Sequence, residues 1–179
     1  PEEICEQSTP AEGSGQNGQY ASAPNLTLEQ GVDFQAIFCT NEGAIYLDLF
    51  EEQAPQTVAN MVFLAGEGFY NNLIFHRVLE GFMAQGGDPT GRGSGGSSRP
   101  DIKAEFSKEP HVRGICSMAR TQNPNSANSQ FFINFKDNDF LNGQYTVYGQ
   151  VTSGMEHVDA LPKGEPPRSP GKIVKAVVG

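Results

Sequence analysis

The stretch from residue 32 to residue 49, VDFQAIFCTNEGAIYLDL, decides how the folded part of the chain begins. Every second side chain from Val32 to Phe38 is apolar, and the alternation resumes from Ile45 to Leu49 after the turn-forming sequence Thr-Asn-Glu-Gly. A period of two is that of a strand with one buried face, and two such runs joined by a glycine-containing turn form a β-hairpin. The sequence therefore predicts an antiparallel strand pair here.

Downstream of this hairpin, strand signals outnumber helix signals. Pro55 suits the first turn of a helix, and apolar residues recur at steps of three and four, which predicts a helix over 55–66. A second, short helix fits 154–161. Strands that follow one another without intervening helices form antiparallel barrels or sandwiches, and we expect a barrel because closure removes exposed edges. Aromatic and branched residues predict the remaining strands at 73–78, 82–85, 115–119, 131–135, 145–151 and 173–178.

The first 28 residues differ in composition from the rest of the chain. They are rich in Glu, Ser, Gly, Gln and Pro and contain few large apolar groups, so they cannot bury enough surface to offset the entropy of ordering. We expect 1–28 to be a flexible arm or linker. Residues 29–179 then form one domain, a length that suits a single hydrophobic core.

Charge and composition exclude several classes of partner and cofactor. The net charge is −9, and all 12 Lys and Arg residues lie from Arg77 onward. Phosphate binding needs clustered cations, so we expect no nucleic-acid partner. No apolar run approaches the roughly 20 residues that span a bilayer. The His and Cys residues are widely spaced and include no CxxC pair, so we expect neither a metal site nor a cofactor.

The three cysteines allow at most one disulfide within the chain. Cys5 lies in the arm and Cys39 at the end of a predicted strand, so a bond between them is sterically possible. We expect instead three unpaired thiols, with Cys116 buried in a strand, because free Cys is among the most buried residue types.

Motifs of two common enzyme classes do not find their required context. Residues 91–96 match GxGxxG, but the Ser-Ser-Arg-Pro that follows cannot open the helix that a dinucleotide site needs. We interpret this segment as a mobile loop at the barrel rim. No serine lies in a GxSxG nucleophile elbow. We interpret His76, the one histidine inside a predicted strand, as a hydrogen-bonded structural residue rather than a base.

One basic residue stands among large apolar side chains in the block FHRVLEGFMAQGGD, which starts at Phe75. If the block begins as a regular strand, Phe75 and Arg77 point to one face, and His76 and Val78 point to the other. An arginine in this company either serves a binding pocket or extends its charged head from the barrel core. The residues alone leave both interpretations open.

Three blocks of the sequence resemble the cyclophilin family of peptidyl-prolyl isomerases, in the expected order. FHRVLEGFMAQGGDPTG (75–91) is similar to the family's FHR-x-x-x-GFM-x-QGGD, and SMARTQNPNSANSQFFIN (117–134) is similar to its SMA and SQFFI block. FLNGQYTVYGQVTSGMEHVD (140–159) is similar to the segment that runs from LDG through VFG to GM. The resemblance implies a mainly β fold: a closed eight-stranded antiparallel β-barrel capped by two α-helices, with an outer groove that binds X-Pro peptides.

The resemblance also implies which residues form the site. Arg77 matches the catalytic arginine, and Gln85 matches a polar residue beside it that could help to orient its guanidinium. The positions that match substrate-binding residues are Phe82, Met83, Gly93, Ala119, Arg120, Thr121, Gln130, Phe132, Phe140, Leu141 and Tyr145.

Some positions depart from the pattern of many family members. Phe140 stands where many have Trp, and Tyr145 stands where many have a His. Phe keeps a hydrophobic wall but lacks the indole N–H, so we expect weaker binding of the family inhibitor cyclosporin. The longer segment at 121–124 and Asn128, where many have Gly, look more like bacterial cyclophilins.

These features predict an enzyme, a peptidyl-prolyl cis-trans isomerase that assists protein folding. We expect a monomer that acts on X-Pro peptides and on unfolded or folding chains. The alternative is a non-catalytic proline-binding or chaperone module that uses the same groove, although a pure binder has no need of a charged donor at the prolyl nitrogen. The arm would suit an exported or lipid-anchored bacterial protein, so an extracytoplasmic location is preferred over the cytoplasm.

Overall fold

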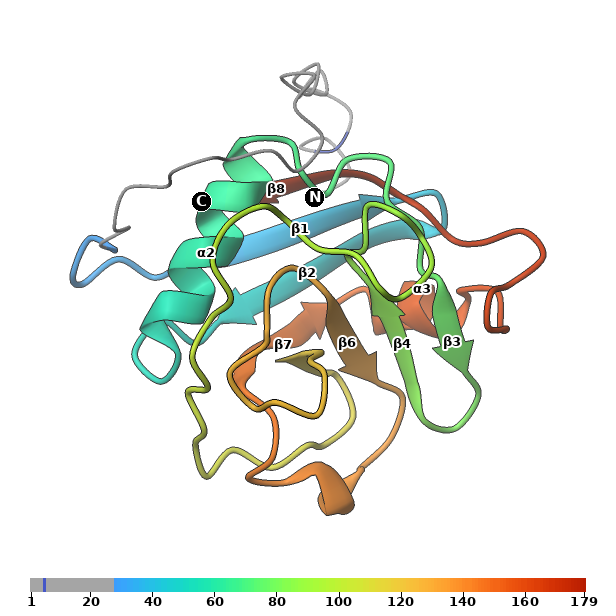
Figure 1. Ribbon diagram of the computed structural model, residues 1–179. Coiled ribbons are helices and arrows are strands. Elements are labelled where there is room, and N and C mark those ends of the chain that lie inside the picture. The colour runs from blue at the N-terminus through green and yellow to red at the C-terminus, as the bar shows by residue number, and fades with distance from the viewer. Residues whose placement is uncertain (1–4, 6–27) are drawn as a thin grey trace.

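The computed structural model describes Cys5 and residues 28–179, and its elements follow the predicted order (Figure 1). The hairpin, both helices and every predicted strand run are confirmed, although the strand predicted at 73–78 is shorter and starts later. The elements are β1 (Gln35–Thr40), β2 (Gly43–Leu49), α2 (Pro55–Gly66), β3 (Arg77–Leu79), β4 (Met83–Gly86), β5 (Ile115–Met118), β6 (Phe131–Asn134), the 3-10 helix η1 (Asp139–Leu141), β7 (Val147–Ser153), α3 (Met155–Asp159) and β8 (Ile173–Val178).

The eight strands form one antiparallel sheet in the order β3-β4-β6-β5-β7-β2-β1-β8, which curls into a barrel. Its closure is looser than predicted, because β3 and β8 end the strand order and do not pair in a ladder. Among the described residues, two isolated bridges and a few backbone hydrogen bonds join the chain around β3 to the start of β8 and the segment before it. These bridges are Ile74 with Lys172 and Val78 with Gly164. The connecting segment 161–172 contains four prolines, which lack the N–H that a continuous ladder requires.

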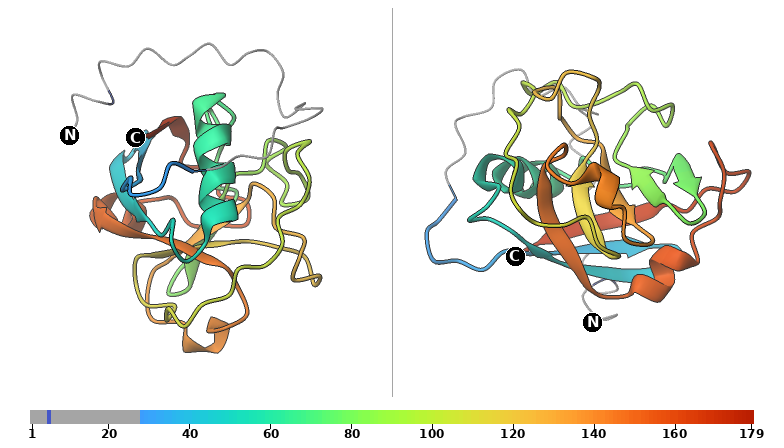
Figure 2. Two further views of the ribbon diagram at one scale, coloured as in Figure 1. Left: turned by 90° about the vertical axis from the view of Figure 1, so that its left-hand side faces the viewer. Right: turned by 90° about the horizontal axis from the view of Figure 1, so that it is seen from below.

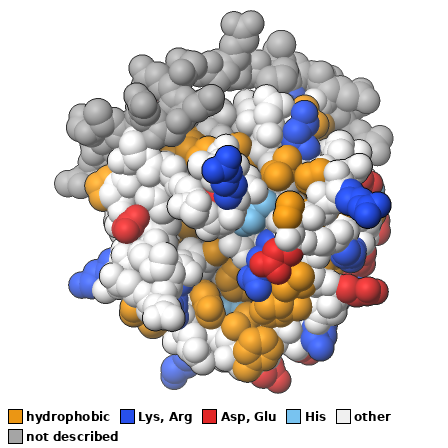
Figure 3. Space-filling view, turned by 45° about the vertical axis from the view of Figure 1, so that its right-hand side comes forward, with side chains coloured by type: hydrophobic (Ala, Val, Ile, Leu, Met, Phe, Trp, Pro, Cys, Tyr) orange, Lys and Arg blue, Asp and Glu red, His pale blue; other side chains and the backbone are white. Residues whose placement is uncertain are grey.

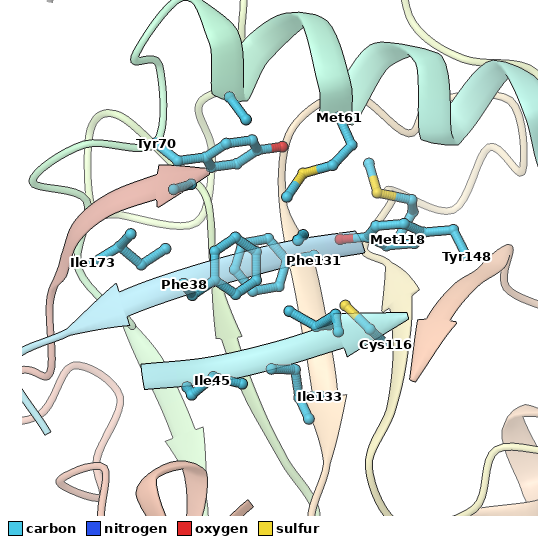
Figure 4. Packing of buried hydrophobic residues seen from close by; sticks show 14 of the residues in the cluster. Phe38, Ile45, Met61, Tyr70, Cys116, Met118, Phe131, Ile133, Tyr148 and Ile173 are labelled. Atoms are coloured by element: carbon cyan, nitrogen blue, oxygen red, sulfur yellow. The ribbon is translucent and has the colours of Figure 1, made fainter. Parts of the chain in front are cut away.

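The two helices lie on opposite sides of the curled sheet (Figures 1 and 2). The core between α2 and the sheet is built around aromatic rings. Phe38 stacks on Phe131 with ring centroids 5.0 Å apart, and Tyr70 meets Phe131 edge-on at 5.9 Å. Met61 of α2 lies above these rings (Figure 4). A packed core of this kind fixes the backbone of β4, β5 and β6, whose outer faces carry the site.

The strand register sorts the side chains of β3, β4, β6 and β5 into two rows. Arg77 lies opposite Gln85, Gln85 opposite Phe132, and Phe132 opposite Ser117. Side chains directly opposite each other in a ladder share a face, so these four residues form one row on the outside of the barrel. The neighbouring row, which faces the core and is fully buried, consists of Val78, Ala84, Ile133 and Cys116.

The prediction that Phe75 and Arg77 share a face was wrong. Phe75 is fully buried, packs edge-on against Phe131 and donates its N–H to the carbonyl of Gly171. The regular strand starts only at Arg77, and alternation between the two faces holds only along a regular strand. His76 is buried, but its ring nitrogens have no hydrogen-bond partner among the described residues, so the expected hydrogen bonds are absent there.

The expectation of three unpaired thiols is also corrected. Cys5 forms a disulfide with Cys39, with the two Cα atoms 5.7 Å apart. No sequence pattern near Cys5 specifies this pairing. Cys116 is free and buried as predicted, and burial raises the pKa of its thiol to about 12. Apart from Cys5 and residue 28, the predicted arm lies outside the described residues.

Within the part of the chain that the structure describes, no helix is long and apolar enough to cross a membrane.

Candidate active site

A small hydrophobic cluster, separate from the core, lies on the outer face of the sheet. Met83, Phe132 and Leu141 are buried in it, and Phe82 and Tyr145 pack against it partly buried. These five side chains line a pocket of about 150 Å³, and its polar walls are Arg77, Gln85 and Arg120, with Ala119 beside them. The space-filling view shows hydrophobic side chains gathered beside basic and acidic side chains that touch (Figure 3).

Arg77, the first residue of β3, lies between the amide oxygen of Gln85 and the carboxylate of Glu165. Its NH1 group donates to Oε1 of Gln85 at 3.5 Å, and its Nε lies 3.0 Å from Oε1 of Glu165. Glu165 reaches this place because Gly164 exchanges two backbone hydrogen bonds with Val78, at 2.9 and 2.8 Å, along the free edge of β3. The guanidinium is thereby held at the pocket wall with its charge partly balanced.

A chain of side-chain amides connects Arg77 to the glycine-rich loop. Gln85 donates through Nε2 to Oε1 of Gln130 at 2.9 Å. Gln130 donates through its own Nε2 to the carbonyls of Gly93 and Gly95, at 3.0 and 2.8 Å. Each amide uses its oxygen on one side and its nitrogen on the other, which fixes the orientation of both.

The glycine-rich loop is fastened by the buried carboxylate of Asp88. This carboxylate is 1% exposed and accepts backbone N–H groups of four loop residues, Thr90, Arg92, Gly93 and Gly95. Burial is the largest single influence and raises the pKa of Asp88, but the hydrogen bonds from the loop together lower it below its ordinary value. The loop expected to move at the barrel rim is thus tied to a charged anchor.

A second hollow of about 350 Å³ adjoins the pocket and collects most of the other predicted residues. Gly93, Thr121 and Gln130 line it together with Ala119 and Arg120, which face both hollows. The Arg120 guanidinium donates to the carbonyl of Gln144 at 2.6 Å and lies 4.6 Å from the centre of the Tyr145 ring. Arg120 therefore separates the two hollows and holds one wall of the smaller one.

Phe140 is the one predicted site residue that lines neither hollow. It is 66% exposed, and its ring lies 5.8 Å from that of Phe82. Phe140 therefore extends the hydrophobic rim beyond the pocket. The sequence missed three residues that the structure places behind or beside the site, namely Asp88, His111 and Glu165. Only Asp88, at the end of the QGGD block, carried a sequence signal.

Comparisons with known proteins agree with this site. Residues 36–178 match the family model described as cyclophilin type peptidyl-prolyl cis-trans isomerase. A "Probable peptidyl-prolyl cis-trans isomerase" of Brucella suis biovar 1 is 51% identical over 153 residues, which cover 76% of this chain and 78% of that protein. Peptidyl-prolyl cis-trans isomerase B of Escherichia coli K12 is 44% identical over 142 residues, covering 69% of this chain and 81% of that protein.

Solved structures point the same way. A cyclophilin type peptidyl-prolyl cis-trans isomerase of Cryptosporidium parvum, crystallised in the presence of the dipeptide Ala-Pro, is 34% identical with a TM-score of 0.76. The match covers 81% of this chain and 98% of that one. With the outer groove and its arginine in place, the chain belongs to the cyclophilin family of peptidyl-prolyl cis-trans isomerases, which bind proline-containing peptides.

Proposed function

We propose that Arg77 is the catalytic residue with which this isomerase speeds rotation about X-Pro bonds, and that the adjoining apolar pocket holds the prolyl ring. An X-Pro bond resists rotation by about 18 to 20 kcal/mol, whereas its cis and trans forms differ by only about 0.5 to 1 kcal/mol. The enzyme therefore has to lower a barrier and leave the equilibrium unchanged.

The charge of Arg77 suits the electronic change at the prolyl nitrogen. Rotation breaks amide resonance, so this nitrogen becomes pyramidal and regains a lone pair, and a donor aimed at it binds the twisted state better than either planar state. A guanidinium stays protonated at physiological pH. NH1 donates to Gln85, Nε faces Glu165 as an ion pair, and NH2 has no protein partner among the described residues. NH2 is thus available to a substrate.

The apolar walls supply the rest of the proposed mechanism. Met83, Phe132 and Leu141 would hold the ring while the residue before proline rotates, and they exclude water that competes for Arg77. No proton is transferred. An acceleration of about 10⁵ requires roughly 7 kcal/mol, within reach of one charged donor combined with positioning.

The single observation that carries this proposal is that Arg77, held by Gln85 and Glu165, lies in the wall of an apolar pocket. A module that only binds proline needs the walls but not a cation at the ring nitrogen. The family match and the isomerase relatives likewise favour catalysis over the binding alternative.

The test is NMR exchange spectroscopy on a short Ala-Pro peptide with catalytic amounts of protein. Uncatalysed exchange takes tens to hundreds of seconds, so sub-second exchange is unambiguous. We expect Arg77→Ala to lower kcat/KM by about 100-fold or more, the cost of losing one transition-state donor. Arg168→Ala removes an exposed arginine away from both hollows and serves as the matched control.

Two outcomes would contradict the proposal. Near-normal exchange by a folded Arg77→Ala protein would remove Arg77 from the mechanism. Absence of catalysis by the wild type, with peptide-induced shifts of Phe132 and Leu141 resonances, would leave a proline-binding module.

We also propose a monomer that acts on proline-containing segments of unfolded or folding chains and binds cyclosporin weakly. Support for weak inhibition comes from Phe140, which offers an exposed ring without an N–H donor. Phe140→Trp should tighten cyclosporin binding about tenfold in a titration, and an unchanged affinity would contradict this part. Light scattering tests the monomer.

We propose an extracytoplasmic location, which the Cys5–Cys39 disulfide supports because such bonds persist in oxidising compartments. Of the three cysteines in this sequence, Cys116 should then be the only free thiol in protein that is recovered from its native source and denatured without reductant. Three free thiols would contradict the proposal.

A further inference from the structure

His111 is a buried titratable residue directly behind the pocket, and the proposed mechanism does not use it. Its side chain is fully buried. The imidazole lies nearly parallel to the ring of Phe132, with centroids 6.3 Å apart and planes at 16°, and edge-on to Tyr145, also at 6.3 Å. Phe132 and Tyr145 meet at 5.5 Å. The three rings form a triangle in which His111 backs two walls of the pocket.

The hydrogen bonds of His111 define which ring nitrogen carries the proton. Oδ1 of Asn142 accepts the backbone N–H of His111 at 2.7 Å, so this atom is an oxygen and not the amide nitrogen. The same oxygen lies 3.2 Å from Nδ1, which must therefore be the protonated nitrogen. Nε2 is then an acceptor for the hydroxyl of Ser117 at 3.0 Å. The neutral ring protonated on Nδ1 satisfies every partner.

The backbone of His111 also fastens the turn that carries Leu141. Its carbonyl accepts the N–H of Asn138 at 2.8 Å, at the start of η1, while Asn142 at the other end is held by the bonds described above. Leu141 lies between these two anchors and is buried against Met83 and Phe132. Three walls of the pocket, Phe132, Tyr145 and Leu141, thus depend on one residue.

We propose that His111, as the neutral imidazole with its proton on Nδ1, is a positioning residue that sets the geometry of the proline pocket. The inference rests on the proposed function in one respect, since it takes this pocket to be the one that holds the prolyl ring. His111 acts through Phe132, Tyr145 and Leu141 and does not itself line the pocket.

Protonation would disturb this arrangement. A second N–H at Nε2 would meet the Ser117 hydroxyl, which would have to turn away and lose its acceptor, and the cation would be buried. Burial lowers the pKa of His111, and the bond to Asn142 opposes this in part. Several ionisable groups lie on the segments around the imidazole. Tyr145 contacts it, and Arg120 lies over the ring of Tyr145. Arg113 is paired with Asp159, and Asp137 and Asp139 lie beside the turn. Among the described residues none of the charged groups forms an ion pair or hydrogen bond with the imidazole.

The first measurement is the tautomer. Imidazole ¹⁵N shifts of the wild type at pH 7.5 should show His111 protonated on Nδ1, the less common neutral form, while His157, with a partly exposed side chain, serves as the internal comparison. Protonation on Nε2 instead would overturn the assignment and the proposal with it.

The second measurement uses Asn142, which is exposed and can be changed without opening the core. Asn142→Ala removes the acceptor and should lower kcat/KM for the Ala-Pro peptide about threefold to tenfold, mainly through KM. Asn142→Asp keeps the acceptor and adds a negative charge that favours the imidazolium. Because protonation of His111 disturbs the pocket, kcat/KM should fall as the pH is lowered. Asn142→Asp should restore activity at pH 7.5 but move the midpoint of this fall to higher pH, as should the ¹H–¹³C titration of His111.

The third measurement removes the ring. His111→Gln keeps a donor and an acceptor but not the stacking, so kcat/KM should fall about tenfold at pH 7.5, and the acid fall that tracks His111 should disappear. His157→Gln should retain the wild-type profile. If the acid fall persists in His111→Gln, or if Asn142→Asp leaves its midpoint unchanged, His111 has no positioning role.

Peptide titrations separate this inference from the proposed function. If the Ala-Pro peptide fails to shift the Phe132 and Leu141 resonances of the wild type, the assignment of the proline pocket is wrong. If the peptide shifts these resonances but its Kd and turnover are unchanged in Asn142→Ala and His111→Gln, the assignment of the proline pocket is kept. The inference about His111 is then wrong.

Discussion

Arg77 illustrates how a charged side chain is made useful at the scale of a residue. An unbraced arginine on an exposed edge strand samples many rotamers, and ordering a long side chain costs up to about 2 kcal/mol. Gln85 and Glu165 restrict the Arg77 side chain before substrate binds, through contacts at NH1 and Nε, so less entropy is lost on binding. Glu165 also offsets the charge of Arg77 without burying it, since both side chains are partly exposed.

At this scale we predict that Glu165→Ala lowers kcat/KM about fivefold, which corresponds to about 1 kcal/mol, the upper range for an exposed ion pair. Glu165→Gln keeps an oxygen acceptor and should lose less. Glu80→Ala removes an exposed carboxylate from the neighbouring hairpin turn and is the control. Equal activity of Glu165→Ala and Glu80→Ala would show that Glu165 does not orient Arg77.

At the scale of elements, the site combines rigid strands with a loop that needs an anchor. The row from Arg77 to Ser117 is set by ladder hydrogen bonds, but Gln130 also depends on the carbonyls of Gly93 and Gly95. Those carbonyls are placed by a loop whose backbone N–H groups converge on Asp88. The amide chain that ends at Arg77 therefore starts at a buried carboxylate.

We predict that Asp88→Ala destabilises the protein by about 2 to 4 kcal/mol, because hydrogen bonds to a charged group are worth about 1.5 to 3 kcal/mol each and are not additive. The amides of Gly93 and Gly95 should exchange with solvent faster, and kcat/KM should fall. Asp88→Asn keeps one acceptor oxygen, so its stability should lie between that of the wild type and that of Asp88→Ala. Unchanged amide exchange in Asp88→Ala would contradict the role of the anchor.

At the scale of the whole molecule, two buried histidines make the free energy of unfolding depend on pH. Burial lowers the pKa of both His76 and His111 below the ordinary value of 6.5. The unfolded chain therefore gains protons at a higher pH than the folded chain does. Stability that is complete above about pH 6.5 is lost as the pH falls from there through the folded pKa values.

We predict that the free energy of unfolding, measured with urea, decreases from about pH 6.5 downward by at most about 1.4 kcal/mol per pH unit for each histidine. His111→Gln should reduce this slope. Asp88 and Asp159 have lowered pKa values, so their contribution is lost only below about pH 4. A stability that is flat between pH 6.5 and 5 would contradict the prediction.

Much of the fold and of the pocket could be predicted because the signals are local. The period of two in β1 and β2 and the three- and four-residue steps from Pro55 to Gly66 mark the faces of these elements that pack into the core. The roles implied for Arg77, Gln85 and Phe132 stay predictions, but the structure does bring these three side chains into one row on one face.

Other features could not be read from the chain, because they depend on segments that meet only after folding. Phe75 points inward because the regular strand starts only at Arg77, and Cys39 pairs with Cys5 across 34 positions of sequence. Glu165 meets Arg77 across 88 positions of sequence only because Gly164 docks on the edge of β3.

The sequence by itself determined the elements, their antiparallel class and the family, since periodicity, turn residues and motif blocks are properties of neighbouring positions. Only the tertiary structure decided which groups lie next to each polar side chain: Glu165 beside Arg77, the glycine loop around Asp88, and the proline pocket in front of His111. Hydrogen bonds and charges act over a few ångströms, and those distances are set by packing, which the order of residues along the chain does not display.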